Sequence, residues 1–423
     1  MKILLSWLSR DGKLLLCARI VRTFAYGFLS VILAIYLKLI GFDDIQIGII
    51  LSVTLINSII FTLFASFYAD RIGRRKTLLL YTIMMSISGI IFFITENPLA
   101  LIIAALIGTL NITGSETSAF LSIEQSILPQ TIKDNRKRNT LFGYYNMAGT
   151  FAMGAGILIA NLPILIQNVS EFDQIYSIKL LFFFYSLLGL FVIGIYLKLS
   201  SDIEIKKQGK TQKKPLKPLS KTLNPKSKKI ISKLSGLFAI DSFAGGFAIQ
   251  SIVSFWFFTK FDIDLSTISY IFSIGSILTA FSYLIAAKIA DRIGLINTMV
   301  FTHIPSNILL ILLAFAPTLE IAIVFYMIRM ALSQMDVPTR QSYIVAVVEE
   351  DERTASAGIT NLSRNIAQAI SPSITGYIIG ILSLSSPFII GGLLKILYDL
   401  LLYINFRKIK PSEEEEDDDA KTK

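Results

Sequence analysis

The chain has too few cysteines and histidines to build a metal centre or a disulfide scaffold. Its 423 residues include one cysteine, Cys17, and one histidine, His303. A single cysteine cannot close a disulfide within a chain, and structural zinc sites draw their ligands from clusters of Cys and His. We therefore expect no metal and no cofactor.

Charge is also scarce. Only 17% of the residues are charged and 53% are apolar, whereas about a quarter of the residues of a soluble domain are charged. The net charge of +10 would suit nucleic-acid binding if the basic residues formed one face, but they lie between apolar runs. The composition indicates a membrane protein whose surroundings are the lipid bilayer and that has no nucleic-acid partner.

The sequence contains no Gly-x-x-x-x-Gly-Lys-Ser/Thr loop, which argues against a nucleotide-driven pump. A membrane-embedded enzyme acting on lipid would need a clustered acid/base or metal set at one interface. Here the carboxylates are scattered along the chain and there is one histidine. We expect that the protein is not an enzyme.

Twelve apolar runs are long enough to cross a bilayer, which takes about 20 residues per helix. The first run is longer than the apolar region of a signal peptide, about 7 to 15 residues, so we expect a retained span. The predicted spans are Leu14 to Ile40, Ile47 to Phe67, Thr77 to Ile94, Leu99 to Phe120, Leu141 to Leu162, Ile178 to Leu199, Leu234 to Phe258, Ile268 to Ala287, Thr298 to Ala316, Leu319 to Val337, Ala355 to Leu382 and Pro387 to Phe406.

Lysine and arginine are concentrated in alternate connections, as in Arg71 to Lys76 and Lys133 to Arg138. Because such residues are retained in the cytoplasm, we expect both termini to be cytoplasmic in a multi-pass protein of the plasma membrane. The predicted domains are a six-helix bundle at 1–199, a basic cytoplasmic linker at 200–233, a second six-helix bundle at 234–406 and an acidic cytoplasmic tail at 407–423.

The two halves repeat one another. Ala69-Asp-Arg-Ile-Gly73 recurs as Ala290-Asp-Arg-Ile-Gly294 after the second span of each half, and Arg22 to Phe28 aligns with Asp241 to Phe247. Six-span parallel repeats place a solute site near the bilayer midplane between the halves. The sequence predicts two pseudo-symmetric bundles that rock around such a site.

The chain resembles the major facilitator superfamily of transporters. The resemblance rests on the twelve spans, the central linker and Tyr68-Ala-Asp-Arg-Ile-Gly-Arg-Arg-Lys-Thr77, which is similar to the family's signature between spans two and three. It implies an all-α membrane fold and alternating access. It also implies that Asp70 latches one conformation near Arg353 and Thr354, within a gating set of Asp70, Arg71, Gly73, Arg74, Asp291, Arg292 and Gly294.

Charges inside spans are costly and mark functional sites. The resemblance suggests that Arg22 and Asp241 approach each other across the midline, and Asp241 or Glu116 could carry a proton. The predicted substrate and proton pathway comprises Arg22, Tyr26, Glu116, Asp241, Arg329 and Arg364.

The remaining charges are given structural roles. Lys395 and Asp399, four residues apart, are interpreted as a structural pair, and His303 as peripheral. Glu124 and Arg340 lie at near-equivalent positions of the two halves and are assigned to an interfacial network.

The sequence thus predicts a secondary active transporter of a small organic solute, with proton coupling and with export as one hypothesis for its direction. The alternatives are an uncoupled uniporter and a receptor or scaffold with transporter ancestry.

Overall fold

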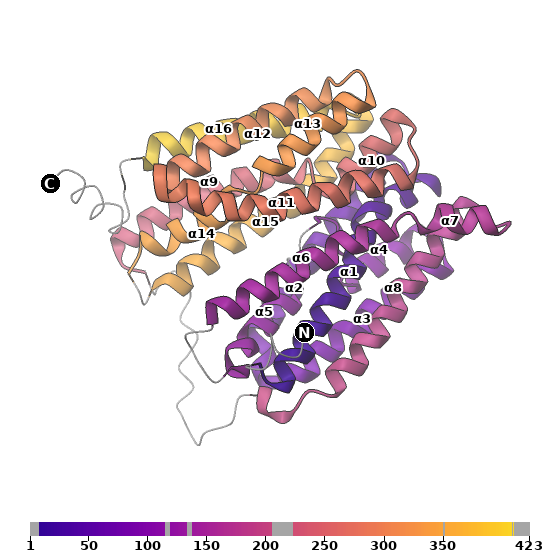
Figure 1. The fold of residues 1–423 in the computed structure, drawn as a ribbon, viewed down its shortest axis with the longest axis horizontal. Helices are drawn as coiled ribbons and strands as arrows, with labels where there is room; N and C mark the ends of the chain where they lie inside the picture. Colours follow the sequence, from indigo (N-terminus) through magenta and orange to yellow (C-terminus); the bar gives the residue numbers. More distant parts are fainter. Residues whose placement is uncertain are drawn as a thin grey trace. The chain divides into compact units, whose positions relative to one another are not determined.

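The computed structural model describes residues 8–114, 119–132, 138–204, 223–349, 352–407 and 409, and these form helices with one isolated bridge, between Leu8 and Ile132 (Figure 1). The helices before the linker are α1 (Arg10–Leu39), α2 (Asp44–Ile72), α3 (Arg74–Ile94), α4 (Pro98–Ile107), α5 (Ala119–Ile127), α6 (Arg138–Ile159), α7 (Leu162–Val169) and α8 (Gln174–Leu197), with short 3₁₀ turns η1 (Leu128–Thr131) and η3 (Ser201–Ile203). Those after it are α9 (Pro225–Gly246), α10 (Gln250–Phe261), α11 (Leu265–Ile293), α12 (Leu295–Ala314), α13 (Leu319–Leu332), α14 (Asp336–Ala346), α15 (Arg353–Ile381) and α16 (Ser386–Phe406).

Ten helical stretches of the described chain are long and apolar enough to cross a membrane. They correspond to ten of the twelve predicted spans. The other two are the fourth, which is interrupted, and the eleventh, which forms the long helix α15 but carries polar residues such as Asn361, Arg364 and Gln368. The membrane-spanning, nearly all-helical fold is therefore confirmed.

Three predicted spans are broken rather than continuous. The fourth span divides into α4 and α5, the seventh into α9 and α10, and the tenth into α13 and α14. Gly114, with φ of 74°, lies between α4 and α5, and Pro338 removes one N–H donor from the first turn of α14. The fourth and tenth spans are equivalents in the repeat, so both halves interrupt the same helix.

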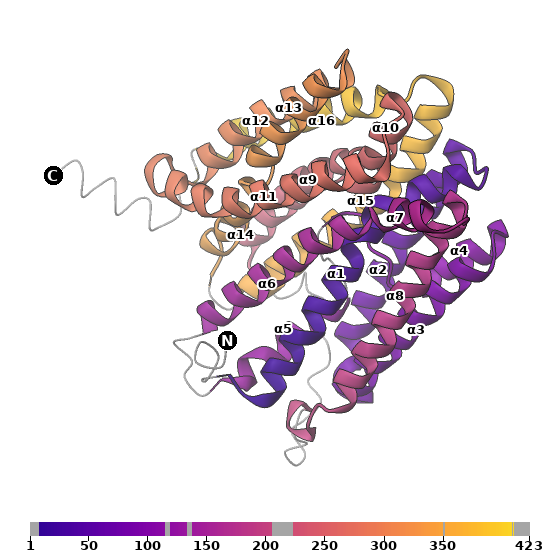
Figure 2. The same ribbon diagram turned by 45° about the vertical axis from the view of Figure 1, so that its right-hand side comes forward.

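The chain forms two compact units, residues 1–211 with 249–276, and residues 212–248 with 277–423. In unit 1, α1 packs along α6 and α3 along α8, as both views show (Figures 1 and 2). Glycines permit the first contact, because a Cβ on Gly156 would meet the carbonyl group of Phe24 and one on Gly27 that of Met153. In unit 2, α9 packs along α15 and α12 along α16.

Candidate functional site

A buried ion pair between Arg22 of α1 and Glu124 of α5 lies inside unit 1. The pair is bidentate, with Nη1 to Oε1 at 2.7 Å and Nη2 to Oε2 at 2.9 Å, and both side chains are fully buried. The hydroxyl of Tyr196 donates to Oε1 at 2.6 Å, and that of Tyr145 donates to Oε2. Because bidentate contacts and two phenols satisfy the carboxylate, the pair offsets its own desolvation.

A second buried network, inside unit 2, is centred on Asp241 of α9. Its Oδ1 accepts from Lys395 Nζ of α16 at 2.6 Å, and its Oδ2 accepts from Arg364 Nη1 of α15 at 2.8 Å. Arg340 Nη1 of α14 lies 3.6 Å from Oδ2, and His303 Nε2 of α12 lies 3.9 Å from Oδ1. One carboxylate thus joins five helices.

The network continues beyond Asp241. His303 Nδ1 lies 2.8 Å from Asp399 Oδ1, and Asn307 Nδ2 donates to Asp399 Oδ2 at 2.9 Å. On the other side, Arg340 donates to Asp336 at 2.5 Å. With a neutral imidazole, three carboxylates face three cations.

Arg22 and Asp241 each have a counter-charge inside their own unit, and their approach across the midline stays a prediction. Each is paired inside its own unit, Arg22 with Glu124 and Asp241 with Lys395 and Arg364. In each half the counter-charge comes from another helix of that half.

Three residues that were given structural or peripheral roles belong to this second network. Lys395, Asp399 and His303 are all buried and connect directly or through each other to Asp241. Their spacing along the sequence gave no sign of this contact, although a lone histidine and an intramembrane Lys–Asp pair are by themselves reasons to search for one.

Arg329, near the end of α13, is the predicted pathway residue whose environment differs most from those of the other cations. Its side chain is 9% exposed, its Nη1 lies 3.9 Å from Met330 Sδ, and its Nε has no hydrogen-bond partner. One turn further, the buried hydroxyl of Ser333 also has none. Within the described ranges, no carboxylate pairs with Arg329.

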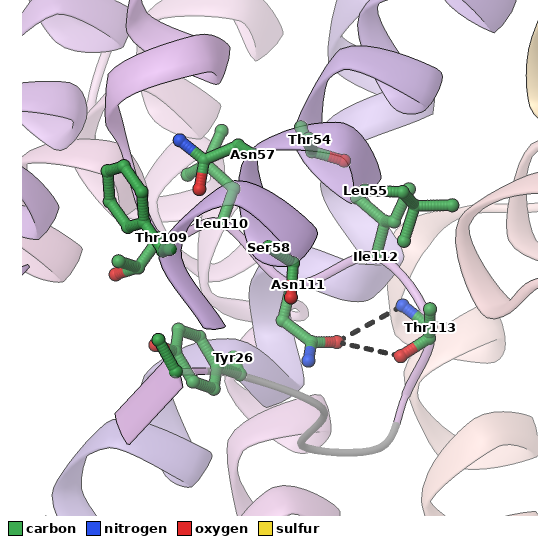
Figure 3. Close-up of a pocket in the computed structure, with 12 residues that line it drawn as sticks. Tyr26, Thr54, Leu55, Asn57, Ser58, Thr109, Leu110, Asn111, Ile112 and Thr113 are labelled. Carbon is green, nitrogen blue, oxygen red and sulfur yellow. Dashed lines mark hydrogen bonds between the residues drawn. The ribbon is translucent and has the colours of Figure 1, made fainter. Parts of the chain in front are cut away.

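Tyr26 lines a pocket in unit 1 beside the break between α4 and α5 (Figure 3). The other polar lining residues are uncharged: Thr54, Asn57, Ser58, Thr109, Asn111 and Thr113. The hydroxyl of Thr109 is buried and has no hydrogen-bond partner in the described structure. In the close-up, the side-chain oxygen Oδ1 of Asn111 accepts from the backbone N–H and the hydroxyl of Thr113.

Neighbouring helices satisfy the backbone carbonyls that the break exposes. Asn57 of α2 donates to Leu106 O, Tyr185 of α8 donates to Thr109 O at 3.1 Å, and the N–H of Ser251 in α10 donates to Ile112 O at 3.2 Å. Irregular backbone at membrane depth is tolerated only with such partners or beside a polar cavity. Three helices, α2, α8 and α10, thus stabilise the break.

The signature turn between α2 and α3 is closed within unit 1. Gly73, with φ of 114°, ends α2, and Asp70 pairs with Arg74 at 2.7 Å. Glu204, which the sequence gave no reason to select, accepts from the backbone N–H groups of Arg74 at 2.7 Å and Arg75 at 3.1 Å. Its carboxylate therefore sits at the N-terminus of α3, where the helix dipole favours an anion.

The remaining predicted gating and pathway residues lie at helix ends or outside the described residues. Arg71 and Arg292 are exposed at the ends of α2 and α11, and Gly294, with φ of 84°, precedes α12 as Gly73 precedes α3. Glu116 lies outside the described residues, as does the side chain of Asp291. The latch between Asp70 and Arg353 stays a prediction.

Comparison with known sequences shows which protein family the chain belongs to. The sequence model of the Major Facilitator Superfamily matches residues 15–335 and 260–423. The chain belongs to the Major Facilitator Superfamily. It is 25% identical over 423 residues to the uncharacterized membrane protein YJR124C of Saccharomyces cerevisiae, covering 94% of each chain, and 20% identical over 384 residues to the uncharacterized MFS-type transporter MJ1560 of Methanocaldococcus jannaschii, covering 90% of this chain and 94% of the relative.

Solved transporter structures share the fold. The nucleoside transporter NupG matches with a TM-score of 0.69 at 15% identity, covering 94% of this chain and 99% of the other. A D-xylose–proton symporter matches with a TM-score of 0.71 at 12% identity, covering 95% and 97%. As a member of the Major Facilitator Superfamily, the protein is a membrane transporter and not an enzyme.

Proposed function

We propose that the protein is a secondary transporter that moves a small organic solute bearing an anionic group, by alternating access and with proton coupling. The family and the sequence repeat support alternating access of two related halves. The finer assignments, of solute class and coupling ion, come from the buried charges.

Arg329 is the observation that carries the assignment of solute class. A guanidinium remains charged under all physiological conditions and presents five donors, and burying such a charge is costly unless an anion or other acceptors compensate. The other cations of the unit 2 network, Arg340, Arg364 and Lys395, already have carboxylate partners. A carboxylate or phosphate on the solute would give Arg329 the anionic partner that the described chain does not provide.

The network around Asp241 supports proton coupling. Six formal charges and one imidazole are gathered in unit 2, most of them buried. Chains of Asp, Glu and His within membrane spans are typical of proton-coupled carriers. A proton added anywhere in a balanced network changes its pairing, which is what a coupled carrier requires.

A second solute class is favoured by a separate observation. The pocket in unit 1 has an uncharged polar lining with the unpartnered hydroxyl of Thr109 in the described structure, which would suit a neutral solute with hydroxyl or amide groups. Two of the structural neighbours are a nucleoside transporter and a D-xylose–proton symporter. A neutral solute is therefore the alternative that the first experiment must separate.

The experiment is solute uptake into liposomes that contain purified protein and a pH-sensitive dye, with anionic and neutral members of matched solute pairs. We expect an anionic solute to drive proton movement. Arg329→Gln should lower uptake at least about tenfold, Arg329→Lys should retain part of it, and Arg407→Gln, which removes an exposed arginine at the end of α16, should leave it unchanged.

The other outcomes each contradict a stated part. Uptake of neutral members alone, unaffected by Arg329→Gln, would replace the anionic class by the neutral one. Solute equilibration without proton movement would identify a uniporter. Binding without flux of any solute would favour a receptor descended from transporters.

A further inference from the structure

We propose that His303 is the residue that binds the coupled proton, at Nε2, and that the proton displaces Lys395 from the imidazole. This inference rests on the proposed proton coupling and locates it. It also moves the proton from Asp241, the carrier that the sequence suggested, to a side chain on α12.

The partners of His303 determine which ring nitrogen is open to a proton. Asp399 Oδ1 lies 2.8 Å from Nδ1, and an ionised carboxylate can only accept, so Nδ1 carries the hydrogen. Nε2 is then the unprotonated nitrogen of a neutral ring. It faces Lys395 Nζ at 3.5 Å and Asp241 Oδ1 at 3.9 Å.

Asp241 is a poor proton acceptor in this arrangement. Each of its oxygens already accepts from a cation, Oδ1 from Lys395 and Oδ2 from Arg364. Arg340 is a third cation, 3.6 Å from Oδ2. A proton on Asp241 would leave three cations without their common anion, whereas one on His303 leaves every carboxylate ionised.

Asp399 is held in a similar way. Its Oδ1 faces the Nδ1 hydrogen of His303 and its Oδ2 accepts from Asn307 Nδ2, which also lies 3.3 Å from Nδ1. The carboxylate, itself held by Asn307, keeps the imidazole in one orientation by accepting from Nδ1, much as a carboxylate orients a catalytic or metal-bound histidine. Asp399 and Asn307 are therefore positioning residues for His303.

The titratable groups that contact His303 lie on two helices, Asp241 on α9 and Lys395 and Asp399 on α16. Further charges reach it only through Asp241, which lies near Arg364 of α15 and Arg340 of α14, and Arg340 in turn pairs with Asp336. The Tyr398 ring stands edge-on with its centroid 6.1 Å from that of the imidazole. No contact between His303 and a titratable group of α13 is found in the described structure.

The charge balance gives the consequence of protonation. With neutral His303, three carboxylates and three cations cancel; a proton on Nε2 adds one positive charge 3.5 Å from the Lys395 ammonium. Like charges at this distance repel. Nε2–H can then turn to Asp241 Oδ1, and Lys395 is released from the imidazole.

This exchange changes a contact between two helices. Lys395 ties α16 to α9, and its Nζ lies 3.6 Å from where a Cβ on Gly245 would stand. Gly245 is one residue from the end of α9, next to the break that precedes α10. A proton on His303 therefore gives Asp241 Oδ1, which already accepts from Lys395, a second donor, from α12, and so changes the contacts that hold this end of α9.

The chain's single histidine allows a direct test. Protein labelled with ¹⁵N-histidine, purified through a tag without histidine, gives one imidazole whose nitrogen shifts are followed from about pH 5 to 9, the range that brackets an ordinary imidazole. We expect one reversible titration at Nε2. Asp399→Asn should disfavour the protonated ring and Lys395→Met should favour it, because an anion and a cation are removed. Invariant shifts in the wild-type protein would overturn the proposal without any variant having to fold.

Transport supplies the second readout. His303→Asn should abolish accumulation driven by a pH gradient while downhill equilibration of the solute continues, and His303→Gln should behave in the same way. Full gradient-driven accumulation in either variant would refute the role of His303 but leave proton coupling intact. Wild-type flux that ignores the pH gradient would refute the coupling itself, and this role with it.

Discussion

Arg22 of α1 and Asp241 of α9 occupy equivalent positions of the repeat but carry opposite charges, and each faces a charge of the opposite sign on the equivalent helix of its own unit. Arg22 pairs with Glu124 at 2.7 Å, and Asp241 lies 3.6 Å from Arg340. Glu124 and Arg340 are themselves near-equivalents in the two sequences. The two units therefore contain opposite charges at equivalent positions with the signs reversed, as a bidentate pair in unit 1 and as a longer contact within a larger network in unit 2.

Breaking the pair in unit 1 should be costly. Arg22→Met leaves Glu124 buried without its guanidinium, and the loss of one partner of a buried pair costs about 3–5 kcal/mol. Arg22→Met combined with Glu124→Leu should recover part of this stability, since no buried charge remains. Thermal unfolding in detergent measures both. Lys38→Met, which breaks a half-exposed pair with Asp44, should cost about 1 kcal/mol or less; an equal effect of the two single variants would show that burial adds nothing to the first pair.

The turn after α2 should influence the balance between inward-open and outward-open states. Asp70→Asn removes the pair with Arg74, and Glu204→Gln removes the negative charge that accepts from two N–H groups at the start of α3. We expect each to change the accessibility of cysteines introduced at the two faces, in a background that replaces the exposed Cys17 by serine. Asp202→Asn, on the neighbouring 3₁₀ turn, is the control. Unchanged accessibility in Asp70→Asn would exclude a latch.

Side chains on α10 tie it to α1. The hydroxyl groups of Ser251 and Ser254 donate to Ser30 O at 2.7 Å and Val31 O at 2.9 Å. Ser251→Ala with Ser254→Ala should weaken this contact by about 0.5–1.5 kcal/mol per bond and make cysteines on the facing surfaces of α1 and α10 more reactive. Ser269→Ala is the matched control, because its hydroxyl bonds to Leu265 O in its own helix. Equal reactivity in both variants would show that the serines do not hold the contact.

Stability should depend on the ionisation of Glu352, at the start of α15. Hydrogen bonds from the Ser227 side chain and then from the Asn224 N–H lower the pKa of Glu352 below its ordinary value. A lowered folded-state pKa stabilises the protein above the unfolded value of about 4.3, and this stabilisation is lost as the pH falls through the folded value. We expect wild-type thermal stability to fall by more than that of Glu352→Gln as the pH is lowered from about 5 through the folded-state pKa. Parallel pH profiles would show that the carboxylate contributes nothing.

The parts of the fold that depend on local sequence were predictable. Long apolar runs specified the spans, and side chains such as Asp43 and Asp173 do cap helices where those runs begin. The interruption between α4 and α5 was not predicted, because Leu99 to Phe120 was taken as one apolar run, although Asn111 to Ser118 is rich in Ser, Thr, Asn and Gly, a composition typical of a break. Its stability depends on donors such as Tyr185 and Ser251, which are far away in the sequence.

The individual residues of the candidate site were predictable from the sequence, but the contacts between them were not. The cost of burying charge selected Arg22, Asp241, Arg329 and Arg364, and all are buried or half-buried. Their pairing could not be deduced, because it depends on which helix faces which. Lys395 and Asp399 were assigned to each other by their spacing, whereas in the structure they contact Asp241 and His303 respectively.

The reversed charges bear on how the two halves can differ. Because Arg22 and Glu124 lie within one unit and Asp241 and Arg340 within the other, a change of sign at either position calls for a compensating change only in the same half. The charges of one half can therefore differ from those of the other, and in the half with the carboxylate on its first helix a lysine and a histidine lie around that carboxylate.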